Sequence, residues 1–142
     1  MNDFKLMVCG FIFSRDMKKL LLIKKRRQTW QKGLLNGVGG RVENETCFQA
    51  MVRETHEEAG LEVPMGRWNY SLSMTAQNWK VYFMWATADI RKAEQCTDEE
   101  IYIIDTKDLA HHKTIPNLKW IVPLLLDNGI SKPVHVRIKT EN

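Results

Sequence analysis

Residues 39–61 have the sequence GGRVENETCFQAMVRETHEEAGL, which predicts a glycine-rich turn followed by a helix. Thr46 and Gln49 fit a capping box, in which each side chain bonds a backbone amide that the first turn of a helix leaves unpaired. Gly60 supplies the left-handed residue that often ends a helix. We therefore expect one helix between these two signals.

Three glutamates occupy the second half of this helix. Glu54, Glu57 and Glu58 are three and four positions apart, so they share one helix face. Like charges at these spacings repel, and the C-terminal end of a helix also disfavours anions. A divalent cation such as Mg²⁺ or Mn²⁺ would relieve the repulsion, with substrate phosphates completing its shell. The alternative is a solvated acidic face in which Arg53 pairs with Glu57.

The preceding turn favours the metal site over the solvated face. It spans residues 37–45 and contains Gly39 and Gly40. Glycines of this kind let the backbone pass close to a metal ion and to bound phosphates. The turn and the acidic helix are adjacent in the chain, so they predict a single phosphate and metal site.

The whole stretch resembles the Nudix box, written GX5EX7REUXEEXGU, where U is a bulky aliphatic residue. Thr55 departs from it at an aliphatic position, although its methyl group can still pack there. The family usually has one more residue between its GG pair and the first motif glutamate. Spacing therefore makes Gly39 the motif glycine, whereas local context favours Gly40. The matching positions are Gly39, Glu45, Arg53, Glu54, Glu57, Glu58, Gly60 and Leu61.

The resemblance implies a magnesium-dependent hydrolase, with manganese as the alternative ion, that cleaves a nucleoside diphosphate linkage by water attack at phosphorus. It makes Glu57 and Glu58 metal ligands and Glu54 a ligand or general base. Gly39 and Gly40 would complete the metal site. Arg53 would act as a positioning residue for Glu54 or Glu45 in the catalytic group.

Many family members add a carboxylate from a distant loop. The matching region here is the acidic run at residues 98–100, just before an expected strand. We expect Glu100 to be this catalytic and metal-binding carboxylate, with Glu99 as the second choice. The remaining alternative is a solvated turn.

The wider chain also resembles the MutT-like nucleoside triphosphate pyrophosphohydrolases, some of which remove oxidised purine nucleotides. This likeness implies that Lys24 binds substrate, together with Gly39 and Gly40 of the turn. Asn36 and Asn117 would contact the base, and Trp30 would stack on it. The alternatives are a turn for Asn36, a helix start for Asn117 and a core edge for Trp30.

The substrate is therefore expected to be a nucleoside triphosphate, possible candidates being 8-oxo-dGTP and other modified nucleotides. Ile115 weakens the purine interpretation, because one such enzyme has a pocket tryptophan there. RNA 5′ ends and nucleotide sugars are the alternative substrates. The basic run at residues 24–27 and the pI of about 9.0 favour RNA. A non-catalytic nucleotide sensor is a further alternative, although it would not need a repulsive glutamate cluster.

Composition predicts one globular domain over residues 1–142, because 44% of the residues are hydrophobic and 27% are charged. No run approaches the roughly 18 apolar residues of a membrane span, so we expect a cytoplasmic protein, as a monomer or homodimer. The three cysteines fit neither a metal site nor paired disulfides, so reduced thiols are expected.

Apolar patterning predicts an α/β (α+β) fold, with a mixed sheet sandwiched between helices. A second helix should run from Pro116 to Leu126, with Pro123 inside it. Val134, Val136 and Ile138 alternate with polar residues, which indicates a last strand or an extended tail. Further strands are expected at about Lys5–Phe13, Lys19–Ile23, Trp68–Thr75, Trp79–Ala88 and Ile101–Ile104.

Overall fold

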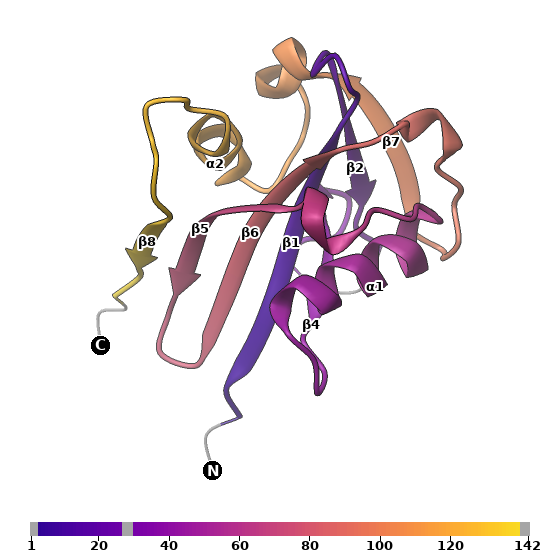
Figure 1. The fold of residues 1–142 in the computed structure, drawn as a ribbon. Helices are drawn as coiled ribbons and strands as arrows, with labels where there is room; N and C mark the ends of the chain where they lie inside the picture. Colours follow the sequence, from indigo (N-terminus) through magenta and orange to yellow (C-terminus); the bar gives the residue numbers. More distant parts are fainter. Residues whose placement is uncertain (1–2, 27–29, 140–142) are drawn as a thin grey trace.

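Strand β1 (Lys5–Phe13) runs through the centre of a mixed, eight-stranded sheet (Figure 1). The structure is a computed structural model that describes residues 3–26 and 30–139. β1 pairs in parallel with β6 along its whole length, and antiparallel with β2 and β4 on its other edge. The other strands are β2 (Lys19–Lys24), β3 (Leu35–Asn36), β4 (Val38–Arg41), β5 (Asn69–Thr75), β6 (Trp79–Thr87), β7 (Glu100–Asp105) and β8 (Val134–Arg137).

The sheet order is β3-β2-β1-β6-β5-β8, with β4 paired to β1 and β7 paired to β2. β1 therefore separates from β2 where it begins to pair with β4. This split in the sheet places β3 and β4, which follow one another in the chain, beside different strands. The two short strands lie next to the site described below.

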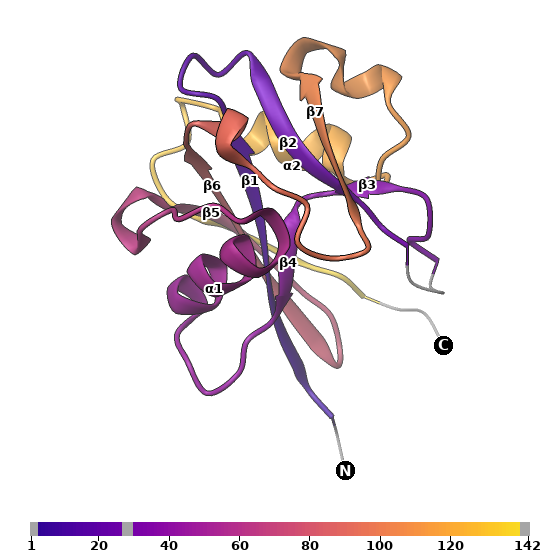
Figure 2. The same ribbon diagram turned by 90° about the vertical axis from the view of Figure 1, so that its right-hand side faces the viewer.

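Helices cover both faces of the sheet (Figures 1 and 2). Alternate β1 residues point to opposite faces, as strand geometry requires. Val8 and Ile12 join a core under α1 (Cys47–Ala59), whereas Phe11 and Phe13 join a second core under α2 (Leu118–Leu125). The predicted mixed sheet between helices is confirmed.

Helix α1 has both predicted end signals. Thr46 accepts a hydrogen bond from the Gln49 amide at 3.1 Å, and the Gln49 side chain accepts one from the Thr46 amide at 2.9 Å. Gly60 is left-handed, with φ of 66°. Met51 packs toward Gly10 of β1, where any side chain would collide with it.

The prediction of a glycine-rich turn at residues 37–45 is largely wrong, because Gly39 and Gly40 belong to strand β4. The reason is close contact with β1. Gly39 pairs with Cys9, and a Cβ atom at Gly39 would lie 2.0 Å from the Val8 carbonyl oxygen. The glycines thus serve strand packing rather than a turn.

The second helix is shorter than predicted. It begins at Leu118 and ends at Leu125, with Pro123 inside it. The preceding segment is extended instead, because the Leu35 amide bonds the Lys113 carbonyl and the Ile115 amide bonds the Leu35 carbonyl. This pairing delays the helix past Pro116. The sequence also missed three short 3-10 helices, η1 (Met65–Arg67), η2 (Ile90–Lys92) and η3 (Thr106–His111).

The last predicted strand is confirmed as β8, which pairs in parallel with β5. Cys9, Cys47 and Cys96 are all free thiols, as expected. Within the described ranges, none of the helices is long and apolar enough to cross a membrane.

We predict that Thr46→Ala lowers the free energy of unfolding by about 1 kcal/mol, because it removes the hydroxyl that caps α1. Thr46→Ser keeps a capping oxygen and should lose much less. Urea unfolding of the two variants and the wild type measures the difference. Equal stability of the alanine and serine variants would contradict this role.

Candidate active site

The Arg53 guanidinium joins three of the glutamates in and before α1. Its Nε and Nη2 donate to Glu45 at 3.0 and 2.6 Å, and its Nη1 donates to Glu54 at 2.9 Å and to Glu57 at 3.2 Å. Nη2 also reaches the Arg41 carbonyl at 2.9 Å. The hydrogen bond from Arg53 lowers the pKa of Glu45 below its usual value. Arg53 is thus fixed at several points and holds Glu54 in one orientation.

Glu54 and Glu58 form a buried carboxyl pair on the face of α1 that packs on β4. Burial raises the pKa of both groups, and that of Glu58 reaches about 8, partly because Glu54 is close. The two side chains hydrogen-bond to each other. Both carboxyl groups are therefore harder to ionise than an ordinary glutamate, as expected where two carboxyl groups meet in a poorly solvated site.

Gly40 makes room for this pair. A Cβ atom at Gly40 would lie 2.4 Å from a carboxylate oxygen of Glu54. The side chain of Glu54 thus rests directly on the backbone of β4, which only glycine permits. Glu57 differs from the pair, because 53% of its side chain is exposed.

The donor set fits a hard divalent cation. Oε2 of Glu58 is buried and has no hydrogen-bond partner within residues 3–26 and 30–139. A buried oxygen of this kind costs free energy unless a proton or a cation satisfies it. Across the same described residues, no three His, Cys, Asp or Glu side chains are already grouped to hold a metal. Phosphate oxygens from a substrate would therefore have to complete the shell.

Glu99 and Glu100 point in different directions. Glu99 is 7% exposed, accepts a hydrogen bond from the Arg26 amide at 3.0 Å, and lies 3.4 Å from Lys25 Nζ. Its charge contributes to the raised pKa of Glu58, which places it near the carboxyl pair. Glu100 instead pairs with the Arg26 side chain and accepts from the Tyr102 hydroxyl at 3.1 Å. Those contacts lower the pKa of Glu100.

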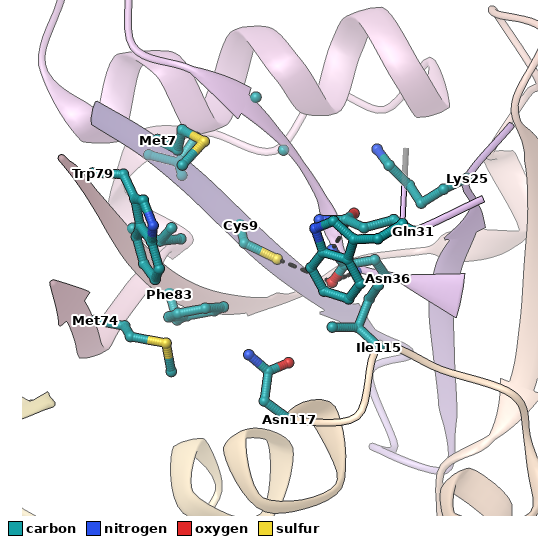
Figure 3. Close-up of a pocket in the computed structure, with 16 residues that line it drawn as sticks. Met7, Cys9, Lys25, Gln31, Asn36, Met74, Trp79, Phe83, Ile115 and Asn117 are labelled. Carbon is teal, nitrogen blue, oxygen red and sulfur yellow. Dashed lines mark hydrogen bonds between the residues drawn. The ribbon is translucent and has the colours of Figure 1, made fainter. Parts of the chain in front are cut away.

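A cavity of about 400 Å³ lies beside the glutamates, on the α2 side of the sheet (Figure 3). Its walls are mainly apolar, and the amides of Asn36 and Asn117 face it from different elements. Gly39 and Gly40 line the cavity, and Gly40 also lies against the Glu54 carboxylate, so it connects the cavity with the carboxyl pair. The lining side chains also include Lys25, Trp30, Phe83, Trp79 and Ile115.

The asparagines differ in what they offer a ligand. Oδ1 of Asn36 accepts from the Gly37 amide at 2.8 Å and from the Cys9 thiol at 3.6 Å. Its amide nitrogen donates one N–H to Gln31 Oε1 at 3.4 Å, which leaves the second N–H for a ligand. Oδ1 of Asn117 is buried without a partner in the described part of the chain. The cavity thus presents a donor and an acceptor.

A family model described as the NUDIX domain matches residues 4–123. The chain belongs to the Nudix family. This match confirms the resemblance found in residues 39–61. It also extends that resemblance from the motif to most of the sheet and to the start of α2.

Relatives within the Nudix family include a CTP pyrophosphohydrolase from Escherichia coli K12, which is 42% identical over 62 residues. That match covers 43% of this chain and 45% of the relative, so it spans less than half of either protein. The shared region thus covers one part of that enzyme only.

Solved structures share the fold across most of the chain. One is MutT, from a study of the Aliivibrio salmonicida and Vibrio cholerae proteins, with a TM-score of 0.74 and 24% sequence identity. The match covers 85% of this chain and 96% of that one. Another is a bifunctional NMN adenylyltransferase/ADP ribose pyrophosphatase from Francisella tularensis, complexed with AMP and a manganese ion. Its TM-score is 0.70 at 15% sequence identity, and the match covers 89% of this chain and 42% of that protein.

The structure brings most of the predicted Nudix site residues together. Trp30, Asn36, Gly39, Gly40 and Asn117 all line the cavity, beside the buried glutamates. The wall formed by β6 was missed, because Phe83 and Trp79 belong to a strand far from the motif. Only the parallel pairing of β1 with β6 brings them there.

Lys24, which the sequence predicted to bind substrate, is not among the residues that line the cavity. Its Nζ sits 5.7 Å from the centre of the Tyr102 ring, whereas its neighbour Lys25 lines the cavity and contacts Glu99. Neighbouring residues at the end of a strand point to opposite sides, and a basic run does not show which member faces the site.

The stability of the protein without metal should depend on pH through Glu58. The unfolded chain ionises this group near its ordinary pKa of 4.5, whereas burial keeps the folded group protonated up to a pKa of about 8. The free energy of unfolding should therefore fall as pH rises from about 4.5 to 8, by on the order of a few kcal/mol. Urea titrations in EDTA at several pH values measure this slope.

Glu58→Gln is the matched control, because it keeps the shape of the side chain and removes its titration. Its stability should change much less over the same pH interval. A wild-type profile as flat as that of the variant would contradict the assignment.

Proposed function

We propose that this Nudix protein is a magnesium-dependent pyrophosphohydrolase that converts a nucleoside triphosphate and water into the monophosphate and pyrophosphate. The buried carboxyl pair of Glu54 and Glu58, held by Arg53 beside a cavity of about 400 Å³, supports this proposal most directly. A site that concentrates negative charge next to a nucleotide-sized cavity suits metal-assisted cleavage of a phosphoanhydride.

Glu54, Glu57 and Glu58 would hold the ion, with the backbone of Gly39 and Gly40 beside them. When bound, it would neutralise phosphate charge and lower the pKa of a water molecule. Mg²⁺ is the proposed ion, and Mn²⁺ is the alternative supported by the Francisella tularensis structure, which contains manganese.

The geometry favours Glu99 over Glu100 as the distal carboxylate, which revises the sequence prediction. Glu99 pairs with the cavity-lining Lys25 and its charge raises the pKa of Glu58, whereas Glu100 is already engaged by Arg26 and Tyr102. An ion-paired carboxylate on the outer edge of β7 would first have to give up those contacts.

The chain's own groups would carry the proton and orient the substrate. Glu54, which Arg53 keeps in place, would act as a ligand or would accept a proton from the attacking water. Water would form a bond to phosphorus as the bond to the pyrophosphate oxygen breaks. Lys25, rather than Lys24, would contact the phosphates, because its side chain lies between the cavity and Glu99.

The base would occupy the apolar cavity. Asn117 would accept a hydrogen bond from a ring or amino N–H, which would satisfy its otherwise unpartnered buried oxygen. Asn36 would donate to a base acceptor, and the Trp30 ring, which is 70% exposed, would stack on the base. The Escherichia coli relative is a CTP pyrophosphohydrolase, which supports cytidine triphosphate as a candidate substrate. The likeness to MutT supports 8-oxo-dGTP as another candidate.

RNA 5′ ends are the second candidate substrate. The basic run that favoured them is partly neutralised, because Lys25 pairs with Glu99 and Arg26 pairs with Glu100. A free nucleotide therefore ranks first. Small nucleotides are the proposed partners, with a cytoplasmic location and a monomer or homodimer as the expected setting.

The deciding experiment is a pyrophosphate-release assay with Mg²⁺ over a panel of natural nucleoside triphosphates and 8-oxo-dGTP. At least one should be hydrolysed, with monophosphate as the second product. Glu57→Gln should abolish this release while keeping the thermal stability of the wild type, because Glu57 is largely exposed and bonds only Arg53 among the described residues. Full activity of Glu57→Gln would remove it from the metal site.

Gly40→Ala tests whether the close approach of Glu54 to β4 matters for catalysis. The new methyl group would occupy the place of the Glu54 carboxylate, so kcat should fall at least about 100-fold, as misplacement of catalytic groups can cause. Gly66→Ala is the matched control, because no atom lies within 4 Å of its added Cβ. Similar activities for the two variants would argue against this positioning.

A further inference from the structure

Charge is distributed very unevenly between the two halves of the sheet. Residues 63–88 and 128–139, which include β5, β6 and β8, contain no Asp or Glu. Their five basic residues exceed the whole formal charge of +4, so the rest of the chain is close to neutral. These residues are Arg67, Lys80, Lys132, Arg137 and Lys139.

Strand register places part of this charge on one face. Val8 of β1 belongs to the core under α1, and it pairs with Tyr82 of β6. Tyr82 pairs in turn with Ser73 of β5, and Ser73 pairs with His135 of β8. Directly paired residues share a face, so this row extends the α1 side of the sheet out to β8. The neighbouring row adds Lys80, Thr75 and Arg137 on the same side.

Aromatic rings gather on this surface, which we call the tyrosine face and define as Tyr70, Tyr82, Lys80, His135 and Arg137. The Tyr70 and Tyr82 rings pack edge to face, with their centroids 5.4 Å apart. The Tyr70 ring also lies beside the His135 ring, with 6.4 Å between the two centroids. Lys80 Nζ lies 4.7 Å from the centre of the Tyr82 ring. The rings and cations therefore form one continuous cluster.

The tyrosine face lies beyond the part of the sheet that α1 covers. α1 packs chiefly on β4 and β1, and Figure 1 shows it to one side of β5 and β8. His135 and Arg137 are exposed, and the tyrosines and Lys80 are half-buried. In the described part of the chain, neither Lys80 nor Arg137 has an ion-pair partner.

We propose that the tyrosine face binds single-stranded nucleic acid. Sequence-tolerant binding of single strands needs cations for the phosphates and aromatic faces on which bases stack. Lys80 and Arg137 supply the cations, and the tyrosine and histidine rings supply the stacking surface. A sheet half without a single carboxylate also avoids repelling a polyanion.

This surface is separate from the catalytic cavity. The cavity is lined by Val81 and Phe83, which alternate along β6 with Lys80 and Tyr82, and by Met74 of β5, which belongs to the core under α2. The two sites therefore lie on opposite sides of the same strands. A nucleic acid strand on the tyrosine face would leave the nucleotide cavity free.

The test is fluorescence anisotropy with a labelled 5′-hydroxyl oligonucleotide of about 12 nucleotides, a length within the span of known single-strand sites. EDTA prevents metal-dependent cleavage, and the 5′-hydroxyl end offers no triphosphate to the cavity. Binding should weaken as salt rises. The double variant Lys80→Gln/Arg137→Gln should reduce affinity about ten-fold and lower the salt slope by about 1.4, since each contact contributes about 0.7 for a single strand.

Three controls separate this site from general charge and from the cavity. Lys18→Gln/Lys92→Gln removes the same charge from exposed positions elsewhere and should bind like the wild type. Asn117→Ala alters the cavity and should also leave oligonucleotide binding unchanged. Nucleotide hydrolysis by Lys80→Gln/Arg137→Gln should match the wild type, so this proposal and the proposed function can fail independently.

Absence of salt-dependent binding by the wild-type protein would overturn the proposal. So would equal loss in the two double variants, or a loss in Asn117→Ala that places the strand in the cavity. If Lys80→Gln/Arg137→Gln has a lower melting temperature than the wild type, the single variant Arg137→Glu tests the proposal instead. Its exposed side chain can reverse charge without disturbing the core, and it should weaken binding more than the glutamine substitution would.

Discussion

The Arg53 guanidinium is the interaction on which the site depends. It neutralises Glu45, aligns Glu54 and reaches Glu57, while a carbonyl of β4 fixes the guanidinium itself. Without the positive charge of Arg53, the helix would carry closely spaced carboxylates and no fixed positive charge among them. Arginine suits this position because its planar fork can serve several acceptors at once.

Burial gives the glutamates their chemical character. Glu54 lies against β4, where Gly40 leaves room for its carboxylate, and burial raises the pKa of both Glu54 and Glu58. A free oxygen of Glu58 stays unsatisfied among the described residues. In the proposed function, a divalent ion would satisfy this oxygen.

The sheet separates the functions assigned to its two sides. Residues that alternate along β6 line the cavity on one face and belong to the tyrosine face on the other. The same strand therefore carries an apolar cavity wall on one side, where we propose the base binds, and a basic aromatic surface on the other, where we propose a nucleic acid strand binds.

Sequence alone determined the local part of this protein. The capping residues of α1, its C-terminal glycine and the glutamate spacing are encoded within a few turns, so both the helix and the Nudix family could be predicted. Tertiary structure decided the direction of neighbouring side chains: Lys25, and not Lys24, lines the cavity, and Glu99 pairs with Lys25 whereas Glu100 pairs with Arg26. Pairing between distant strands sets those directions, and a one-residue change in register reverses them.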